Sequence, residues 1–413
     1  MVEHFFIRSR TIRRFHDGPL GEWIDRFAER LWDRGYARVT ARSKLWLVGD
    51  LSWWLEHQGL AVGALNEEIV ESFLREAKQL GFSNLAYGRV TLRELLSLLR
   101  ETGTIPARPP QVDDTPLQRI ERDFRQYLTR ERRLADSTLK NIVPPVRRFL
   151  TERFGTEPPS LGELTTSDVT RFLLRHVEIL GPARAQKMAY GLRSFFRFLL
   201  LRGDTAMDLS ISVPKVADWQ LSTLPKSLKR EEVESLLESC DQTTVTGQRD
   251  YTILLLLARL GLRAGEIVAM TLDDIDWEAG EFRVRGKGGR DDRLPIPRDV
   301  GKALAHYLRH GRPRCTTRRV FVRMHAPRRG FTTSVAICDV VRRALSRACI
   351  DSPRKGAHLL RHSLASEMLR RGASLDEIGE VLRHQLQDTT AIYAKVDLAA
   401  LRDLACSWPG GEV

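Results

Sequence analysis

Residues 358–393 read HLLRHSLASEMLRRGASLDEIGEVLRHQLQDTTAIY, and the pattern of this stretch predicts three short helices. In the first of them, Leu360, Leu364 and Met368 recur every four residues and supply an apolar face. Gly372 is suited to end that helix, because glycine readily adopts the left-handed conformation that often follows a helix.

The other two helices follow at once. Ser374 and Glu377 have the three-residue spacing of a capping box, which predicts the start of the second helix. His384 follows where that helix is expected to end. Asp388 is a suitable cap for the third helix, which we expect to carry Tyr393.

Four polar side chains of this stretch form a candidate site. His358 and Arg361 lie three residues apart and therefore share one face of a helix. Together with His384 and Tyr393 they could converge on one phosphate group. A lone histidine or tyrosine is more often structural, so this interpretation depends on further groups upstream.

The stretch GLRAGEIVAM at 261–270 supplies the first of those groups. Arg263 stands beside a glycine turn at the foot of a predicted helix, where a guanidinium is well positioned to bind a phosphate. An ion pair between Arg263 and Glu266 is the structural alternative.

A predicted β-hairpin supplies the second group. Phe282 and Val284 alternate with arginines in one strand, and Leu294 and Ile296 belong to the next. The glycine-rich turn GKGGRDD between the strands carries Lys287. This turn lacks the spacing of a nucleotide-binding P-loop, and we therefore exclude that kind of site.

In this order, the arginine, lysine, histidine and tyrosine positions resemble those of the tyrosine recombinases, also called the phage-integrase family. GLRAGEI is similar to the family's first arginine box and LLRH to its second, and both motifs have Xer-like sequences. Lys287 matches the family's hairpin lysine. The nine residues from His384 to Tyr393 (393 − 384 = 9) match its usual spacing. Arg383 departs from the family, which usually has glycine before this histidine.

The resemblance implies a site-specific DNA recombinase that cleaves and rejoins DNA through a 3′-phosphotyrosine, as the integrase or transposase of a mobile element. The implied roles are Tyr393 as nucleophile, Arg263, Arg361 and His384 as phosphate-binding groups, Lys287 as general acid, His358 as candidate base for the tyrosine, and Glu266 as support for Arg263. A type IB-like topoisomerase and a catalytically silent DNA-binding protein are the alternatives.

The same resemblance implies partners and cofactors. We expect double-stranded DNA as the substrate and self-assembly on DNA into a tetramer, with sister recombinases as further candidate partners. A phosphotyrosine ester retains the energy of the broken DNA bond, so we expect no cofactor and no ATP. No cluster of carboxylates in the sequence suggests a divalent metal, so we expect chemistry without a metal ion.

Composition agrees with a polyanionic partner. The 413 residues carry a net charge of +13, which favours a polyanionic partner, most often nucleic acid. A surface charge that serves only solubility is the equal alternative. Five scattered cysteines without a C-x-x-C pair argue against a zinc site or a disulfide framework. They favour a reducing cytoplasm, where we expect the protein to associate with the nucleoid. No apolar run is long enough to span a bilayer, so we expect no membrane partner.

Two similar sets of amphipathic helical patterns precede the candidate site. EIVESFLR at 68–75 resembles DVTRFLLR at 168–175, and LRELLSLLRETG at 92–103 resembles LRSFFRFLLLRG at 192–203. We infer a duplicated small helical domain. Chance similarity between two amphipathic four-helix units is the alternative.

The expected fold is mainly α with a small antiparallel β-sheet, in which one or two SAM-like helical domains precede an α+β catalytic domain. The expected boundaries are 1–105 for an N-terminal helical domain that opens on a flexible basic lead (1–20), 116–205 for the core-binding domain that the resemblance implies, 206–228 for a linker, and 229–413 for the catalytic domain, with one more amphipathic helix at 397–413.

Basic residues of the core-binding domain are candidates for contacts with DNA phosphates. For any one of them, a solvated surface charge is the plainer interpretation. They are Lys140, Arg147, Arg148, Arg184, Lys187, Arg193 and Arg197.

Overall fold

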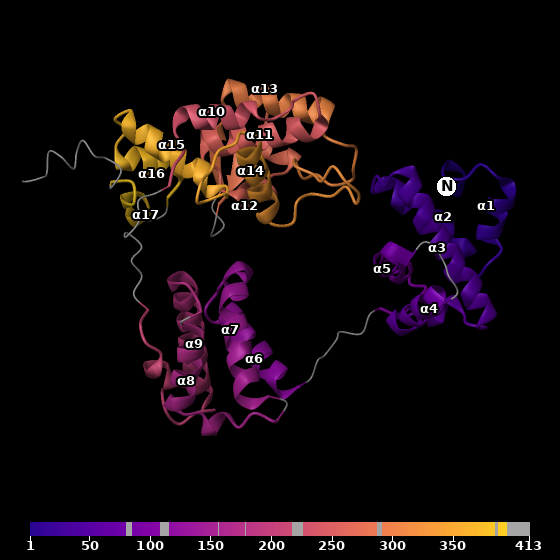
Figure 1. Ribbon diagram of the computed structural model, residues 1–413, viewed down its shortest axis with the longest axis horizontal. Coiled ribbons are helices and arrows are strands. Elements are labelled where there is room, and N and C mark those ends of the chain that lie inside the picture. Colours follow the sequence, from indigo (N-terminus) through magenta and orange to yellow (C-terminus); the bar gives the residue numbers. More distant parts are fainter. Residues whose placement is uncertain are drawn as a thin grey trace, which may run out of the picture. The chain divides into compact units, whose positions relative to one another are not determined.

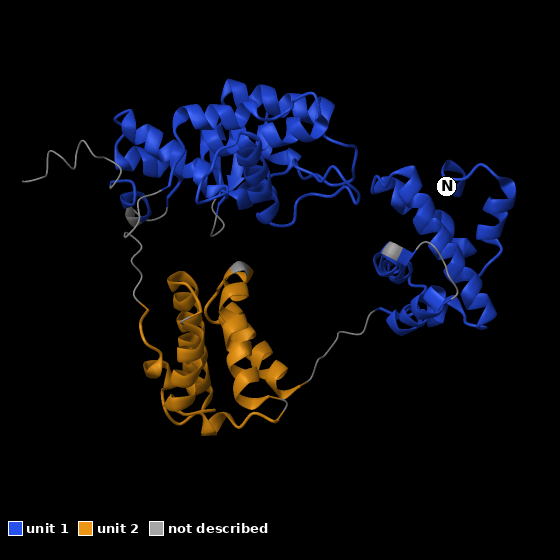
Figure 2. Ribbon diagram, viewed as in Figure 1, with its two compact units in different colours: residues 1–107, 224–413 blue, residues 108–223 orange. Residues whose placement is uncertain are grey.

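The structure is a computed structural model that describes residues 1–79, 85–107, 115–155, 157–177, 179–216, 226–286, 291–384 and 387–394. It consists mostly of helices with one small sheet (Figure 1). The chain divides into two compact units, of which one contains residues 1–107 and 224–413 and the other residues 108–223 (Figure 2).

The first hundred residues form a helical group with a hydrophobic core of its own. Its elements are η1 (Val2–His4), α1 (Ser9–His16), α2 (Gly21–Asp33), α3 (Arg38–His57), η2 (Val62–Ala64), α4 (Glu67–Gln79), η3 (Leu85–Tyr87) and α5 (Gly88–Glu101). Ile24, Phe27 and Leu31 of α2 are buried, as their helical spacing predicts. Asn66 caps α4, because its side-chain oxygen accepts the backbone N–H of Ile69 at 2.9 Å.

The prediction of a flexible basic lead over residues 1–20 is wrong. Helix α1 lies within it, and Val2, Phe5, Phe6 and Phe15 are buried in the core of this helical group. The basic residues gave the segment its apparent polarity, but these apolar side chains lie between them and bury enough surface to order the chain.

The described residues of the unit 108–223 form four helices and two short 3₁₀ turns around a second core. They are α6 (Pro116–Arg130), α7 (Asp136–Phe154), η4 (Leu161–Glu163), α8 (Thr166–Val177), α9 (Pro182–Arg202) and η5 (Leu209–Ser212). Helix α9 packs closely on α7 at Gly191, where a Cβ atom would lie 2.8 Å from the carbonyl oxygen of Ile142. The helix order repeats that of α2 to α5, and the duplication stays a prediction.

The stretch 206–228, which we expected to be a linker throughout, is ordered in part. Leu209 and Val213 are buried against the core of α6 to α9. Leu228 belongs to the core of the following domain. Residues 217–225 lie outside the described residues.

The carboxyl-terminal domain is built on helix α11 (Val245–Leu260), which packs against its neighbours on several sides. Its elements are α10 (Arg230–Glu238), α11, α12 (Ala264–Ala269), η6 (Leu272–Asp274), β1 (Ile275–Asp276), β2 (Glu281–Arg285), β3 (Asp291–Pro295), α13 (Arg298–His306), η7 (a π-turn, Tyr307–Gly311), α14 (Val335–Arg347), α15 (His358–Arg370), α16 (Leu375–Leu382) and α17 (Gln387–Ala391).

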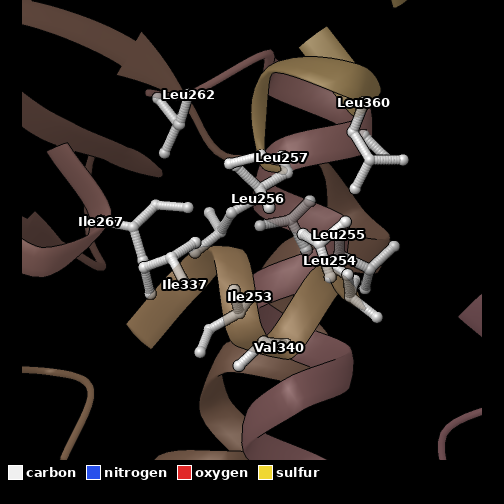
Figure 3. Packing of buried hydrophobic residues seen from close by; sticks show 14 of the residues in the cluster. Ile253, Leu254, Leu255, Leu256, Leu257, Leu262, Ile267, Ile337, Val340 and Leu360 are labelled. Atoms are coloured by element: carbon white, nitrogen blue, oxygen red, sulfur yellow. The ribbon is translucent and has the colours of Figure 1, made fainter. Parts of the chain in front are cut away.

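The second half of α11, residues 252–258, is buried on every side, as expected for a segment that is apolar on every face. Its residues Ile253 to Leu257 are each at most 1% exposed. They pack against Ile267 from α12, Ile337 and Val340 from α14, and Leu360 from α15 (Figure 3). This central helix therefore holds the elements that carry the two arginine motifs in one rigid framework.

The predicted hairpin is present as part of a three-stranded antiparallel sheet of order β1-β2-β3. Phe282 pairs with Leu294 across β2 and β3, and Phe282 and Val284 are buried. Arg283 and Arg285 point to the other face, as strand alternation requires. The turn residues 287–290 lie outside the described residues.

The three helices of the 358–393 stretch form, with two corrections. Gly372 adopts φ 86° after α15, and Ser374 and Glu377 make the predicted capping box of α16. Helix α17 begins at Gln387, so Asp388 lies inside it and is not its cap. Tyr393 follows the end of α17 and is not carried on it. The predicted helix at 397–413 lies outside the described residues.

Deleting residues 1–107 is expected to leave the remaining chain folded, because among the described residues the core of α1 to α5 draws its buried side chains from positions 2 to 105. Circular dichroism and thermal unfolding of residues 108–413 would test this. Loss of a cooperative transition in the truncated protein would mean that the deleted helices complete the core of another domain.

Candidate active site

Arg263 is held by the helix that it starts. It is the N-cap residue of α12, and its backbone N–H donates to Glu266 Oε2 at 2.8 Å. Its Nη1 donates to Glu266 Oε1 at 2.9 Å. The side chain of Arg263 is 31% exposed, whereas that of Glu266 is 5% exposed. The ion pair that we considered as the structural alternative is therefore present, and it leaves part of the guanidinium open to a ligand.

Arg361 projects from α15 and is buried. Its Nη1 donates to the carbonyl oxygen of Gly261, at the end of α11, and its Nη2 donates to that of Leu382, at the end of α16. Burial, and then the neighbouring charge of Arg263, lower the pKa of Arg361 to about 10. The guanidinium remains charged at neutral pH, and the surrounding positive charge favours an anion beside it.

Gly261 must be glycine for two reasons. Its φ is +58°, in the left-handed region that side chains disfavour, and a Cβ atom there would lie 2.6 Å from Leu382 Cδ2. This close approach brings the ends of α11 and α16 together, which is what allows one guanidinium to bond to both.

Arg383, which stands where the related family has glycine, also adopts a left-handed conformation, with φ 55° and ψ 52°. Its carbonyl oxygen accepts from Arg263 Nη2 at 3.2 Å, and its own Nη2 donates to Glu266 Oε2 at 2.7 Å. Its side chain is 10% exposed. Glu266 is thus shared by two arginines, and Arg383 holds Arg263 through its backbone and through this shared carboxylate.

His384 lies beside the tyrosine. The His384 and Tyr393 rings are nearly parallel, at 3°, with centroids 6.4 Å apart. His384 Nδ1 is hydrogen-bonded to Thr390 Oγ1 at 2.7 Å. Burial, then Arg361 and Arg263, lower the pKa of His384 to about 4. When the Thr390 hydroxyl donates to Nδ1, the neutral ring carries its proton on Nε2, the donor that a phosphate oxygen needs.

Tyr393 is 1% exposed, and its hydroxyl is 2.8 Å from His362 Nδ1. Burial raises the pKa of Tyr393 to about 12. The sequence prediction missed His362, although it is the last residue of the LLRH motif. We expected His358 beside the tyrosine. His358 is instead exposed at the first turn of α15, with its ring centroid 6.3 Å from that of His362. Partial loss of hydration, then Arg361 and Arg263, lower the pKa of His358.

The structure thus brings together five of the six predicted catalytic residues. Hydrogen bonds connect Arg361 to the ends of α11 and α16, and Arg263 to the end of α16. The ring of His384 lies parallel to that of Tyr393, whose hydroxyl contacts His362, and His358 lies one turn from His362 on α15. Lys287 lies outside the described residues. Among the described residues, no group of three His, Cys, Asp or Glu side chains is arranged to hold a metal ion.

The candidate DNA contacts of the α6–α9 unit fall into two groups. Arg147 donates to both carboxylate oxygens of Glu121 at 2.6 Å, Arg148 pairs with Glu152 at 3.6 Å, and Arg193 donates to the Pro214 carbonyl at 3.0 Å. The remaining four are exposed: Lys140, Arg184, Lys187 and Arg197. The paired Arg147 and Arg148 are exposed as well. Within the described ranges, no helix is long and apolar enough to cross a membrane.

Comparison with known proteins gives consistent matches. The model of the Phage integrase family matches residues 226–399. A Sinorhizobium fredii protein named "Putative integrase/recombinase y4rA" is 45% identical over 414 residues, which cover 99% of each chain. The tyrosine recombinase XerD of Listeria innocua is 30% identical over 68% of this chain and 95% of its own.

Solved structures share the fold. That of the XerH site-specific recombinase bound to palindromic difH substrate has a TM-score of 0.55 at 20% identity, and the match covers 76% of this chain and 94% of that one. That of the Tn1549 transposon integrase in complex with circular intermediate DNA has a TM-score of 0.50 at 17% identity, covering 69% and 98%.

Glu266→Gln is expected to lower the free energy of unfolding by about 3 kcal/mol, because it leaves the buried Arg383 without its carboxylate partner. The matched double variant Glu266→Gln/Arg383→Gly should regain part of this loss, since it removes the orphaned charge of Arg383 and places glycine at the positive φ, while Arg263 still lacks its carboxylate partner. Urea unfolding of the two variants, with Arg383→Gly alone as control, measures the coupling. If the double variant is no more stable than Glu266→Gln, the prediction that the buried Arg383–Glu266 pair stabilises the fold is wrong.

Proposed function

The chain belongs to the phage integrase family of tyrosine recombinases, and from this premise we propose that it cleaves and rejoins DNA at specific sites through a 3′-phosphotyrosine at Tyr393. The observation that carries the proposal is the meeting of Arg263 and Arg361 at the ends of α11 and α16, next to the helix-end turn that carries His384. Two fixed guanidinium groups beside a phenol suit a phosphodiester as the reacting group.

The chemistry needs a nucleophile, stabilisation of the charge on the phosphoryl oxygens, and a proton for the leaving 5′-oxygen. Tyr393 supplies the nucleophile. Arg263 and Arg361 bind the non-bridging oxygens, and donors of this kind typically contribute about 10²–10³ in rate each. His384 adds a further hydrogen bond through Nε2, and the exposed ring of His358 is available for another.

Lys287 acts as the general acid in this proposal, by its position in the hairpin motif. Proton transfer by such a group contributes about 10²–10⁴ in rate. The tyrosyl ester keeps the energy of the DNA bond, so the reaction proceeds without ATP. The two arginines and His384 stabilise the phosphoryl charge in place of a metal ion. Glu266 supports Arg263 from behind, with Arg383 on its other side.

Double-stranded DNA is the proposed partner. Relatives of the same fold have been solved on DNA, namely XerH on difH and the Tn1549 integrase on circular intermediate DNA. The exposed basic residues of α7 and α9 are candidate phosphate contacts, among them Lys140, Arg184 and Lys187. Assembly into a tetramer on DNA, cooperation with sister recombinases and association with the bacterial nucleoid complete the proposal.

Tyr393→Phe is expected to abolish covalent attachment to DNA while leaving DNA binding nearly unchanged, because it removes one hydroxyl and little else. Nicked duplexes drawn from the DNA flanking the gene would be incubated with wild-type or variant protein in EDTA and resolved on a denaturing gel. A tyrosine-dependent shifted band establishes the nucleophile and the independence from metal ions together.

Two results would contradict this proposal. An adduct that persists in Tyr393→Phe would mean that another residue is the nucleophile. Relaxation of supercoiled plasmid of arbitrary sequence, without recombinant products, would identify the activity as that of a topoisomerase.

A further inference from the structure

Tyr393, the nucleophile of the proposed reaction, contacts His362, a residue that has no role in that proposal. The Tyr393 hydroxyl is 2.8 Å from Nδ1 of His362, and the two rings lie at 60° with centroids 5.6 Å apart. Among the described residues, neither of the other two histidines of the site, His384 and His358, makes this contact. His384 uses its Nδ1 for Thr390, and the ring of His358 lies 6.3 Å from that of His362.

The position of His362 is fixed by a rigid element. It follows Arg361 on α15, whose residues Leu360, Arg361 and Ser363 are buried. Helix α15 packs against the central helix α11 and against α16. Nδ1 is therefore held in place by the core of the domain, and Tyr393 is brought to it by the turn that follows α17.

The protonation states give this hydrogen bond a direction. Burial, then His358, Arg354 and Arg361, lower the pKa of His362 to about 4, so the ring is neutral at neutral pH. Burial raises the pKa of the Tyr393 phenol to about 12, so the phenol keeps its proton. The phenol is then the donor and Nδ1 the acceptor, with the ring proton of His362 on Nε2.

DNA binding would strengthen the acceptor. In the free protein, burial disfavours a protonated His362 most, and the positive charge of Arg354 and Arg361 adds to this effect. A phosphodiester bound between the arginines carries a negative charge that offsets this repulsion. His362 therefore becomes a better proton acceptor when the substrate is in place.

We propose that His362, rather than His358, is the catalytic residue that takes the proton of Tyr393, an assignment that rests on the proposed function. As Tyr393 Oη forms its bond to phosphorus, the phenol proton moves to His362 Nδ1. The bond from phosphorus to the 5′-oxygen breaks, and that oxygen receives its proton from the general acid. In religation the 5′-hydroxyl returns its proton to the deprotonated general acid and its oxygen attacks phosphorus. The bond from phosphorus to Tyr393 Oη breaks, and the proton on Nδ1 returns to the departing phenolate.

The test is single-turnover cleavage of a nicked duplex by the full chain, comparing wild type with His362→Asn. Asparagine places an amide near the position of Nδ1, where it accepts a hydrogen bond but cannot take up a proton. The expected loss in cleavage rate is about 10²–10³-fold with DNA binding retained. A loss of less than about tenfold overturns the assignment, because a missing general base typically costs more than that.

A second arm separates proton transfer from positioning. Tyr393 is replaced by a fluorinated tyrosine whose phenol is more acidic and depends less on a base. The loss caused by His362→Asn should shrink on this phenol, whereas the loss caused by the comparison variant His358→Asn should be the same on both phenols. An equal His362→Asn loss on the two phenols overturns the assignment and leaves His362 as a positioning residue.

The comparison is made between phenols in the same variant background, so a partly unfolded preparation affects both rates alike. Wild-type protein that forms no tyrosine-dependent adduct would overturn the proposed function itself. Wild-type protein that forms the adduct, with His362→Asn equally active, would overturn only the role of His362.

Discussion

The guanidinium groups of Arg263 and Arg361 are both positive, and the protein has to hold them close together before any phosphate is bound to neutralise them. Arg263 and Arg361 repel each other, and the repulsion grows where burial lowers the local dielectric constant. The lowered pKa of Arg361 reflects both burial and this neighbour. Three backbone carbonyls at the ends of α11 and α16, together with the carboxylate of Glu266, offset the repulsion and fix both side chains.

Helix ends are well suited to this task. The last carbonyl groups of a helix have no partner within it and carry the negative end of the helix dipole, so they attract cations. Both α11 and α16 finish in a left-handed residue, Gly261 and Arg383. A non-glycine residue in that conformation is strained by roughly 1–2 kcal/mol, and the ion pair of Arg383 with Glu266 opposes that strain.

The same cations control the histidines. Burial and the nearby arginines keep His362 and His384 neutral, each with a pKa of about 4. A neutral imidazole has one nitrogen that donates and one that accepts, so it can serve both a phosphate oxygen and a phenol. Had these rings been protonated, they would add positive charge to the site but could not accept a proton from Tyr393.

Local patterns in the sequence were enough for the capping box of α16, the hairpin and the amphipathic helices, because each depends on residues a few positions apart. Motif order and spacing likewise identified the candidate catalytic residues. The same local reasoning failed at residues 1–20, whose apolar side chains find their partners in α2 and α3.

Local patterns also could not predict which histidine contacts Tyr393. His358 and His362 lie one turn apart on the same face of α15, so periodicity cannot choose between them. The packing of α16 and the short α17 decides that choice, because it sets how far along α15 the tyrosine reaches.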